Sequence, residues 1–152
     1  MESAITPQDR VITAYRCHPF AVLRGGTIKG VISELLGRQA GMSNGKGGSM
    51  HLFTPSFFGG NGIVGAQVPV GAGIALAQKY QGKKTATFSL YGDGASNQGQ
   101  VFESYNMVST AIERSVARYL FYPFRPSSGI SPLSSFVRTT NTAWGPPISV
   151  AP

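Results

Sequence analysis

The sequence has one cysteine, no long apolar run and few acidic residues. The single thiol, Cys17, excludes a disulfide within the chain and is typical of a reducing compartment. No stretch of about 18 apolar residues is present, which excludes a transmembrane helix. The amino terminus also lacks a basic, apolar leader, so any targeting sequence of the intact protein is expected outside this chain.

The 13 Lys and Arg residues outnumber the 6 Asp and Glu residues, which gives a formal net charge of +7. Such a charge is typical of nucleic-acid or membrane-surface binding. However, the cations are scattered singly apart from Lys83-Lys84, and no basic stripe alternates with aromatic residues. We therefore expect no nucleic-acid partner and no membrane span. The length of 152 residues allows one domain at most.

Two regions of the chain differ in character. Residues 1–107 resemble ordinary α/β sequence, whereas residues 108–152 are crowded with proline and serine. Because proline removes an amide donor and fixes φ, the second region is predicted to be an irregular or disordered C-terminal tail. Within the first region, the apolar patterns predict helices over 28–36, 67–80 and 97–107, a strand over 85–90, and a mobile glycine-rich loop over 41–48.

The sharpest motif runs from Tyr91 to Gly99 and contains Gly92-Asp93-Gly94 between the predicted strand and helix. A carboxylate at the end of a strand can ligate Mg²⁺, and the flanking glycines let the backbone approach a diphosphate. The start of the following helix offers free amide donors at the same place. A common Asp-Gly turn remains the alternative interpretation of these three residues.

Three stretches carry a resemblance to a known family: residues 45–51 (GKGGSMH), 59–69 (GGNGIVGAQVP) and 91–100 (YGDGASNQGQ), supported by Ile12 to Arg16 and His18. In this order they resemble the alpha subunits of the pyruvate dehydrogenase first component, which are thiamine-diphosphate-dependent 2-oxoacid dehydrogenases. The resemblance covers residues 1–107 and implies a partial thiamine-diphosphate-binding fold, an α/β parallel sheet with flanking helices.

Carried over by position, the resemblance implies a set of cofactor contacts. Arg16 would engage the diphosphate with its planar fork, and Asp93 would ligate Mg²⁺. Thr54 matches a pocket position where the family often has a different small residue. The implied cofactor-binding residues are Tyr15, Arg16, Thr54, Gly62, Val64, Asp93, Gly94 and Ala95.

Each of these residues also has a structural interpretation. Tyr15 and Arg16 could be surface residues, and Thr54, Gly62 and Val64 could be loop and core. His51 is expected to be a structural hydrogen-bonding histidine instead of a base. Cys17 is expected to be a small packed residue instead of a nucleophile.

For the whole protein, the resemblance implies oxidative decarboxylation of pyruvate to acetyl-CoA in the mitochondrial matrix. The implied partners are a beta subunit, which supplies an activating glutamate, and a lipoyl-bearing acetyltransferase. The alpha chain alone therefore holds no complete site, and this chain is expected to be inactive. A branched-chain or acetoin-type dehydrogenase, or a non-catalytic fragment that pairs with a beta subunit, remains open.

The resemblance stops after Met107. The family completes its Mg²⁺ shell with an Asn-Asn pair further along, where this chain has Phe121-Tyr122-Pro123. The codons of Val108-Ser109 can contain an intron donor sequence, and the codons of residues 120–125 can form a pyrimidine-rich acceptor sequence. Removing that interval shifts the frame, and residues 139–146 can then be rewritten as Asn-Asn-Gln-Tyr-Gly-Met-Gly-Thr. We therefore predict that residues 108–152 are a non-native tail, with a retained intron over 108–125 and a shifted frame over 126–152.

Overall fold

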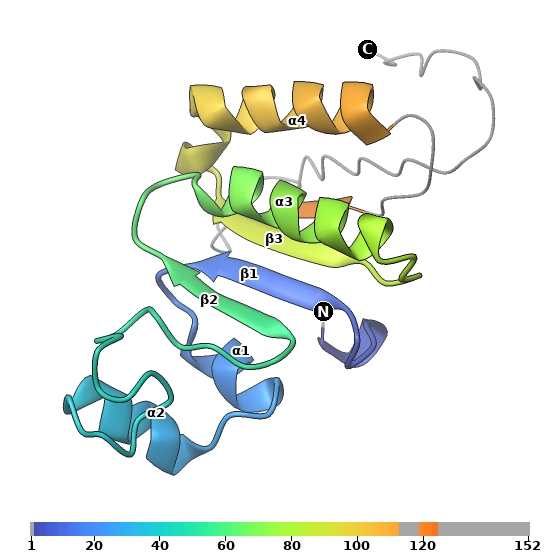
Figure 1. Cartoon of the computed structure of the whole chain (residues 1–152). Coiled ribbons are helices and arrows are strands. Elements are labelled where there is room, and N and C mark those ends of the chain that lie inside the picture. The colour runs from blue at the N-terminus through green and yellow to red at the C-terminus, as the bar shows by residue number, and fades with distance from the viewer. Residues whose placement is uncertain (1, 113–118, 125–152) are drawn as a thin grey trace.

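A parallel sheet lies at the centre of the chain (Figure 1). The computed structural model describes residues 2–112 and 119–124, and within them the strand order is β2-β1-β3-β4. Each neighbouring pair is parallel. The four strands are β1 (Arg10–Ala14), β2 (Phe57–Asn61), β3 (Thr87–Gly92) and β4 (Tyr119–Phe124).

Helices cover both faces of this sheet (Figure 1). On one face α3 (Gln67–Tyr80) packs against β3 and β1, and α4 (Gly99–Ile112) packs against α3. On the other face lie α1 (His18–Leu23) and α2 (Ile28–Leu35). Two short 3-10 helices, η1 (Glu2–Ala4) and η2 (Gly94–Asn97), complete the described elements. The predicted α/β fold with flanking helices is confirmed.

Side chains of β3 alternate between the two faces, as the two-residue period of a strand requires. Phe88 and Leu90 belong to the core beneath α1 and α2, whereas Tyr91 belongs to the core under α3 and α4. Ser89 also faces α3, and a Cβ on Gly71 would overlap its side chain. Glycine at position 71 therefore allows α3 to lie directly on β3.

The β1–β2 pair is irregular. Its register shifts between Val11 and Thr13, and Gly59 in the middle of β2 has a φ of +80°. Few residues other than glycine adopt this left-handed backbone conformation. The irregularity lies on an edge strand of the described sheet, because β2 has a neighbour on one side only among the described strands.

The predicted elements agree with the structure to within a few residues. The helix predicted over 67–80 is α3, and the one predicted over 28–36 is α2. The predicted strand over 85–90 is displaced to Thr87–Gly92, because Tyr91 and Gly92 pair with β4. No described helix has the length and apolar character needed to cross a membrane.

Two expectations need correction. Residues 108–112 continue α4, and 119–124 form β4, so these parts of the predicted irregular tail are regular. Pro123 lies within β4, which is the edge strand of the sheet among the described residues, and an edge strand tolerates proline because it needs amide donors on one side only. The loop over 41–48 was predicted to be mobile, but its amides donate hydrogen bonds to the buried carboxylate of Glu34. The remaining residues of the predicted tail lie outside the described ranges.

Candidate functional site

The parallel strands bring the ends of three segments to one edge of the sheet. Because β1, β2 and β3 run in the same direction, the loops that follow them all leave from the carboxyl edge (Figure 1). Ligands of open α/β sheets bind at this edge. Seven of the eight predicted cofactor-binding residues follow these strands: Tyr15 and Arg16 after β1, Gly62 and Val64 after β2, and Asp93, Gly94 and Ala95 after β3.

Asp93 occupies the turn between β3 and η2. Its backbone carbonyl accepts hydrogen bonds from the amide of Ser96 at 3.1 Å and from the Ser96 hydroxyl at 2.5 Å. Its carboxylate is exposed and makes no hydrogen bond or ion pair with any described residue. Ala95 anchors the turn in the core between α3 and α4, and the space around Gly94 is open. This arrangement leaves the Asp93 carboxylate available to a ligand.

The residues after β1 form an exposed aromatic and cationic pair. Tyr15 is 60% exposed, and the guanidinium carbon of Arg16 lies 5.8 Å from the centre of its ring. The one ion pair among the described residues joins Arg24 and Glu2, so Arg16 has no carboxylate partner there. Its positive charge therefore remains available to an anion.

The segment after β2 is tied to the segment after β3. The Gln100 side-chain amide, at the start of α4, donates to the carbonyl oxygen of Val64 at 2.6 Å. The Ile63 amide donates to the Asn61 side chain at 3.3 Å. The Val64 side chain is 56% exposed and is free to contact a ligand. The Gln100 contact was missed in the sequence because nothing in the pattern pairs residues so far apart.

The sequence of this edge matches known proteins. The model of the dehydrogenase E1 component family matches residues 1–114. The chain belongs to this family.

Several curated relatives are similar over most of the family region. The mitochondrial pyruvate dehydrogenase E1 component subunit alpha of Chaetomium thermophilum is 69% identical over 107 residues, which is 70% of this chain and 26% of the relative. The corresponding Saccharomyces cerevisiae subunit is 64% identical over the same shares. The somatic form from Rattus norvegicus is 58% identical over 109 residues, 72% of this chain and 28% of the relative. The chain thus spans about a quarter of the relatives it matches.

Thr54 stands apart from the other predicted residues of this E1-family chain. Its amide and carbonyl exchange hydrogen bonds with Phe57 at 3.0 and 3.2 Å, which forms the turn that leads into β2. That turn is at the amino end of β2, whereas Gly62 follows its carboxyl end. The geometry therefore does not group Thr54 with the residues of the carboxyl edge, and its cofactor role stays a prediction.

Gln67 is a polar residue of this edge that the sequence analysis missed. It is 1% exposed and begins α3, where its side-chain amide donates to the Leu90 carbonyl at 3.0 Å. Its Oε1 atom is buried without a partner among the described residues. A glutamine at the head of a helix of small apolar residues was the available signal.

His51 and Cys17 have structural contacts, as predicted. The Nδ1 atom of His51 lies 3.0 Å from the Gly47 carbonyl oxygen. Cys17 is fully buried, and its Sγ lies 3.4 Å from the Met50 carbonyl oxygen. Burial raises the pKa of the Cys17 thiol, although backbone hydrogen bonds partly oppose this. The pair Lys83-Lys84 is exposed before β3.

The described residues fit a diphosphate better than they fit a complete magnesium shell. Arg16, the open turn at Gly94 and the carboxylate of Asp93 suit an anion with its metal ion. Mg²⁺ demands near-octahedral oxygen coordination, to which Asp93 contributes one carboxylate. No group of three or more His, Cys, Asp or Glu side chains suited to a metal ion occurs within the described part of the chain.

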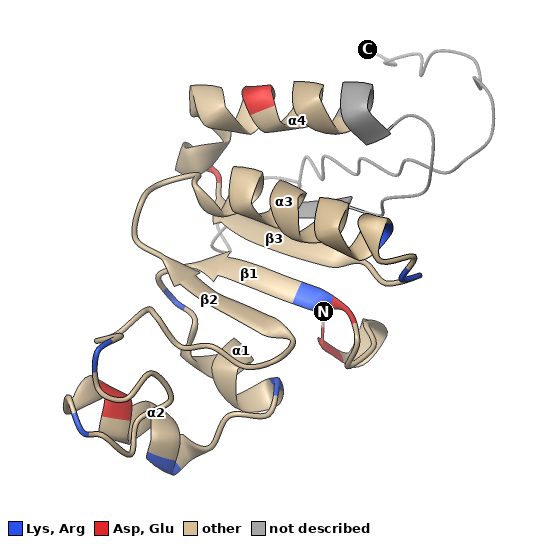
Figure 2. Cartoon of the chain, viewed as in Figure 1, with Lys and Arg blue, Asp and Glu red and all other residues tan. Residues whose placement is uncertain are grey.

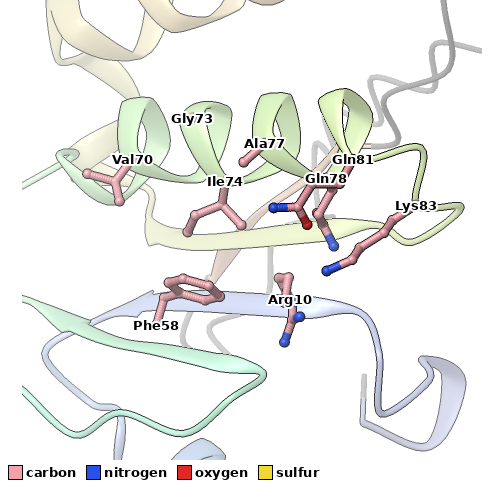
Figure 3. A pocket seen from close by; sticks show the side chains of 9 residues that line it. All are labelled: Arg10, Phe58, Val70, Gly73, Ile74, Ala77, Gln78, Gln81 and Lys83. Atoms are coloured by element: carbon pink, nitrogen blue, oxygen red, sulfur yellow. The ribbon is translucent and has the colours of Figure 1, made fainter.

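A separate groove of about 490 Å³ lies away from this edge (Figure 3). Phe58 of β2 faces Ile74 of α3 across it, and Arg10 and Lys83 lie toward one end. Arg10 is the first residue of β1, so this end of the groove is at the amino edge of the sheet. The groove therefore lies away from the motifs, and we assign the candidate site by the convergence of functional side chains instead.

The cations are spread over several elements and form no single stripe in Figure 2.

Proposed function

We propose that residues 1–107 are part of a thiamine-diphosphate-binding domain of the pyruvate dehydrogenase alpha type, with the cofactor diphosphate at the carboxyl edge. The observation that carries this proposal is that Arg16, Gly62 and Asp93 follow three neighbouring parallel strands and therefore lie at one edge of the sheet. The dehydrogenase E1 family depends on thiamine diphosphate in general, which supports the choice of cofactor.

In this proposal each residue has a defined task. Asp93 supplies an oxygen ligand to Mg²⁺, while Gly94 and Ala95 present amides to the diphosphate. Arg16 neutralises phosphate charge, with Tyr15 beside it. Gly62 and Val64 line the aminopyrimidine. When bound, the cofactor supplies the electron sink for decarboxylation of a 2-oxoacid, and the protein supplies position and electrostatics.

We further propose that the chain alone is inactive, because its sequence lacks the Asn-Asn pair that completes the Mg²⁺ shell in the family. Residues 108–152 would be a non-native tail that arises from a retained intron and a shifted frame. Support comes from the family match, which ends at residue 114, and from relatives that align over 107 to 109 residues. Sequencing the transcript tests this proposal, since a mature message that keeps the interval would contradict it.

The relatives are named as mitochondrial alpha subunits, which supports further proposals for the whole protein. These proposals are a mitochondrial matrix location, assembly with a beta subunit, and transfer of the acetyl unit from pyruvate to a lipoyl-bearing acetyltransferase. No nucleic-acid partner is proposed, and a gel-shift assay at low salt would reveal one. Assays with pyruvate, branched-chain 2-oxoacids and acetoin distinguish the three substrate types.

Calorimetry with thiamine diphosphate and Mg²⁺ tests the central proposal. We expect no micromolar binding by the chain alone. A chain encoded without the interval, with its frame restored and mixed with a beta subunit, should bind the cofactor. In that background Asp93→Asn should abolish Mg²⁺-dependent binding, whereas Glu103→Gln on the exposed face of α4 should not. Tight binding by the unaltered chain alone would contradict the proposal.

A second candidate function is a non-catalytic fragment that pairs with a beta subunit. The observation in its favour is the exposed apolar surface of α2 and of the residue that follows it, where Ile28, Ile32 and Leu36 are 67%, 51% and 68% exposed. Exposed apolar surface of this kind is typical of interaction sites. Sedimentation of the chain with a beta subunit, followed by a turnover assay, distinguishes pairing from catalysis.

A further inference from the structure

Glu34 is a buried acidic residue for which the proposed function has no role. It lies on the inner side of α2 and is fully buried. Its carboxylate makes no ion pair with a described cation. A buried charge is costly unless hydrogen bonds compensate it, so its partners indicate what it does.

The partners of Glu34 are backbone amides of the glycine-rich loop. Oε2 accepts hydrogen bonds from the amides of Ser43 at 2.7 Å and Gly45 at 3.0 Å, and Oε1 accepts one from Gly47 at 2.5 Å. Amides of three alternate residues thus converge on one anion, as they do in the anion-binding concavity of a backbone nest. Here the anion belongs to the protein itself.

The glycines allow the loop to wrap closely around this carboxylate. Gly45 has a φ of +76°, which favours glycine. A Cβ on Gly41 would collide with the backbone of Glu34, and a Cβ on Gly47 would lie 3.1 Å from Glu34 Oε1. The sequence of the loop is thus fitted to an internal anion.

The same loop is connected to the candidate site. The Gly47 carbonyl oxygen accepts from the His51 amide at 3.3 Å, which closes a turn that contains Met50. The Met50 carbonyl accepts from the Gly60 amide at 2.8 Å, at the end of β2. The Met50 side chain lies beside Gly62, with its Cε 3.1 Å from the place of a Gly62 Cβ.

We propose that Glu34 is a positioning residue, whose carboxylate organises residues 43–51 and thereby fixes the Gly60–Gly62 segment through Met50. The lowered pKa of Glu34 agrees with this role: burial alone would raise it, but the amide donors outweigh burial. The inference goes beyond the proposed function, because it concerns the shape of the segment and requires no bound cofactor.

Hydrogen exchange of the full chain, measured by mass spectrometry, tests the inference. In Glu34→Ala, exchange in 43–51 and 57–62 should accelerate about tenfold or more, while β3 and α3 stay protected. Sodium formate should restore the protection by entering the vacated nest, and sodium chloride at equal ionic strength should not. Glu103→Ala removes an exposed acid on α4 and serves as the matched control, with no change expected.

Unchanged exchange at 57–62 in Glu34→Ala, or recovery with chloride as well as formate, would overturn the proposal. If Glu34→Ala fails to fold, as circular dichroism would show, Glu34→Gln decides the matter. Glutamine keeps the volume and one acceptor oxygen, so a smaller acceleration confined to the same two segments is expected. Wild-type exchange in Glu34→Gln would equally overturn the proposal. No arm involves thiamine diphosphate, so failure here is distinct from failure of the proposed cofactor site.

Discussion

The molecule holds two carboxylates in opposite circumstances. Asp93, at the carboxyl edge of the sheet, is exposed and has no partner among the described residues, whereas Glu34 is fully buried and accepts three backbone hydrogen bonds. The first is open to a ligand, and the second holds its own chain in place. An acidic residue in a glycine-rich segment is structural when backbone amides of the fold already donate to its carboxylate. It is available for binding when the fold supplies no such donors.

Crowding at Gly60, between the loop around Glu34 and the carboxyl edge of the sheet, is expected to give the largest change in stability. A Cβ on Gly60 would lie 2.9 Å from both the Ala14 carbonyl oxygen and Cys17 Sγ. Gly60→Ala should therefore lower the free energy of unfolding by about 1–3 kcal/mol, as overpacking does. Gly94→Ala, where no atom lies within 4 Å of the added Cβ, is the control. Urea denaturation of both variants measures the effect, and equal midpoints would show that the junction is not tightly packed.

Acid is expected to destabilise the loop around Glu34, with a smaller effect on stability than Gly60→Ala. Because the pKa of Glu34 is lowered in the folded chain, its stabilising effect is present above the unfolded pKa. That effect is lost as the pH falls through the lowered folded value. Thermal unfolding of the wild type between pH 7 and pH 3 should show this loss, and Glu34→Gln should show a flatter profile. Parallel profiles for both proteins would assign the acid sensitivity to other groups.

The Cys17 thiol, which lies beside Met50 and Gly60, should be protected from alkylation. Burial raises the pKa of Cys17, so the neutral thiol persists to higher pH than a free cysteine. Alkylation by iodoacetamide at pH 8 should be slow in the native chain and should reach the rate of a free thiol in urea. Rapid native alkylation would show that the contact of Cys17 with Met50 opens readily.

The smallest effect is expected at the exposed carboxylate. Asp93→Asn removes a charge with no described partner, so stability should change by no more than about 0.5 kcal/mol. Urea denaturation measures this change beside Glu34→Gln, which should destabilise the chain more. Strong destabilisation by Asp93→Asn would show that the carboxylate is structural, and the contrast with Glu34 would disappear.

Local pattern predicted much of this fold. The helix over 67–80 was predicted with its observed bounds, because its small apolar residues form a continuous run. The motif that contains Asp93 was also predicted to follow a strand, whereas the strands before Arg16 and Gly62 were not predicted. Parallel pairing of all three strands places these residues on one edge.

Contacts between distant residues were beyond reach of the pattern. Glu34 bonds a loop that its helical spacing does not reveal, and Gln100 reaches Val64 from another element. The pairing of β4 with β3 was missed because Pro123 is unfavourable in a strand unless that strand lies at an edge. Tertiary partners decided these positions, and a single sequence does not display them.

The kink at Gly59 has a consequence for solubility. An outermost strand presents unpaired amides and carbonyls, and a straight one invites strands of other molecules to join it. The left-handed glycine and the shifted register interrupt that row of donors and acceptors within five residues. An irregular edge strand of this kind disfavours the addition of a strand from another molecule, so we expect β2 to oppose fibrous association.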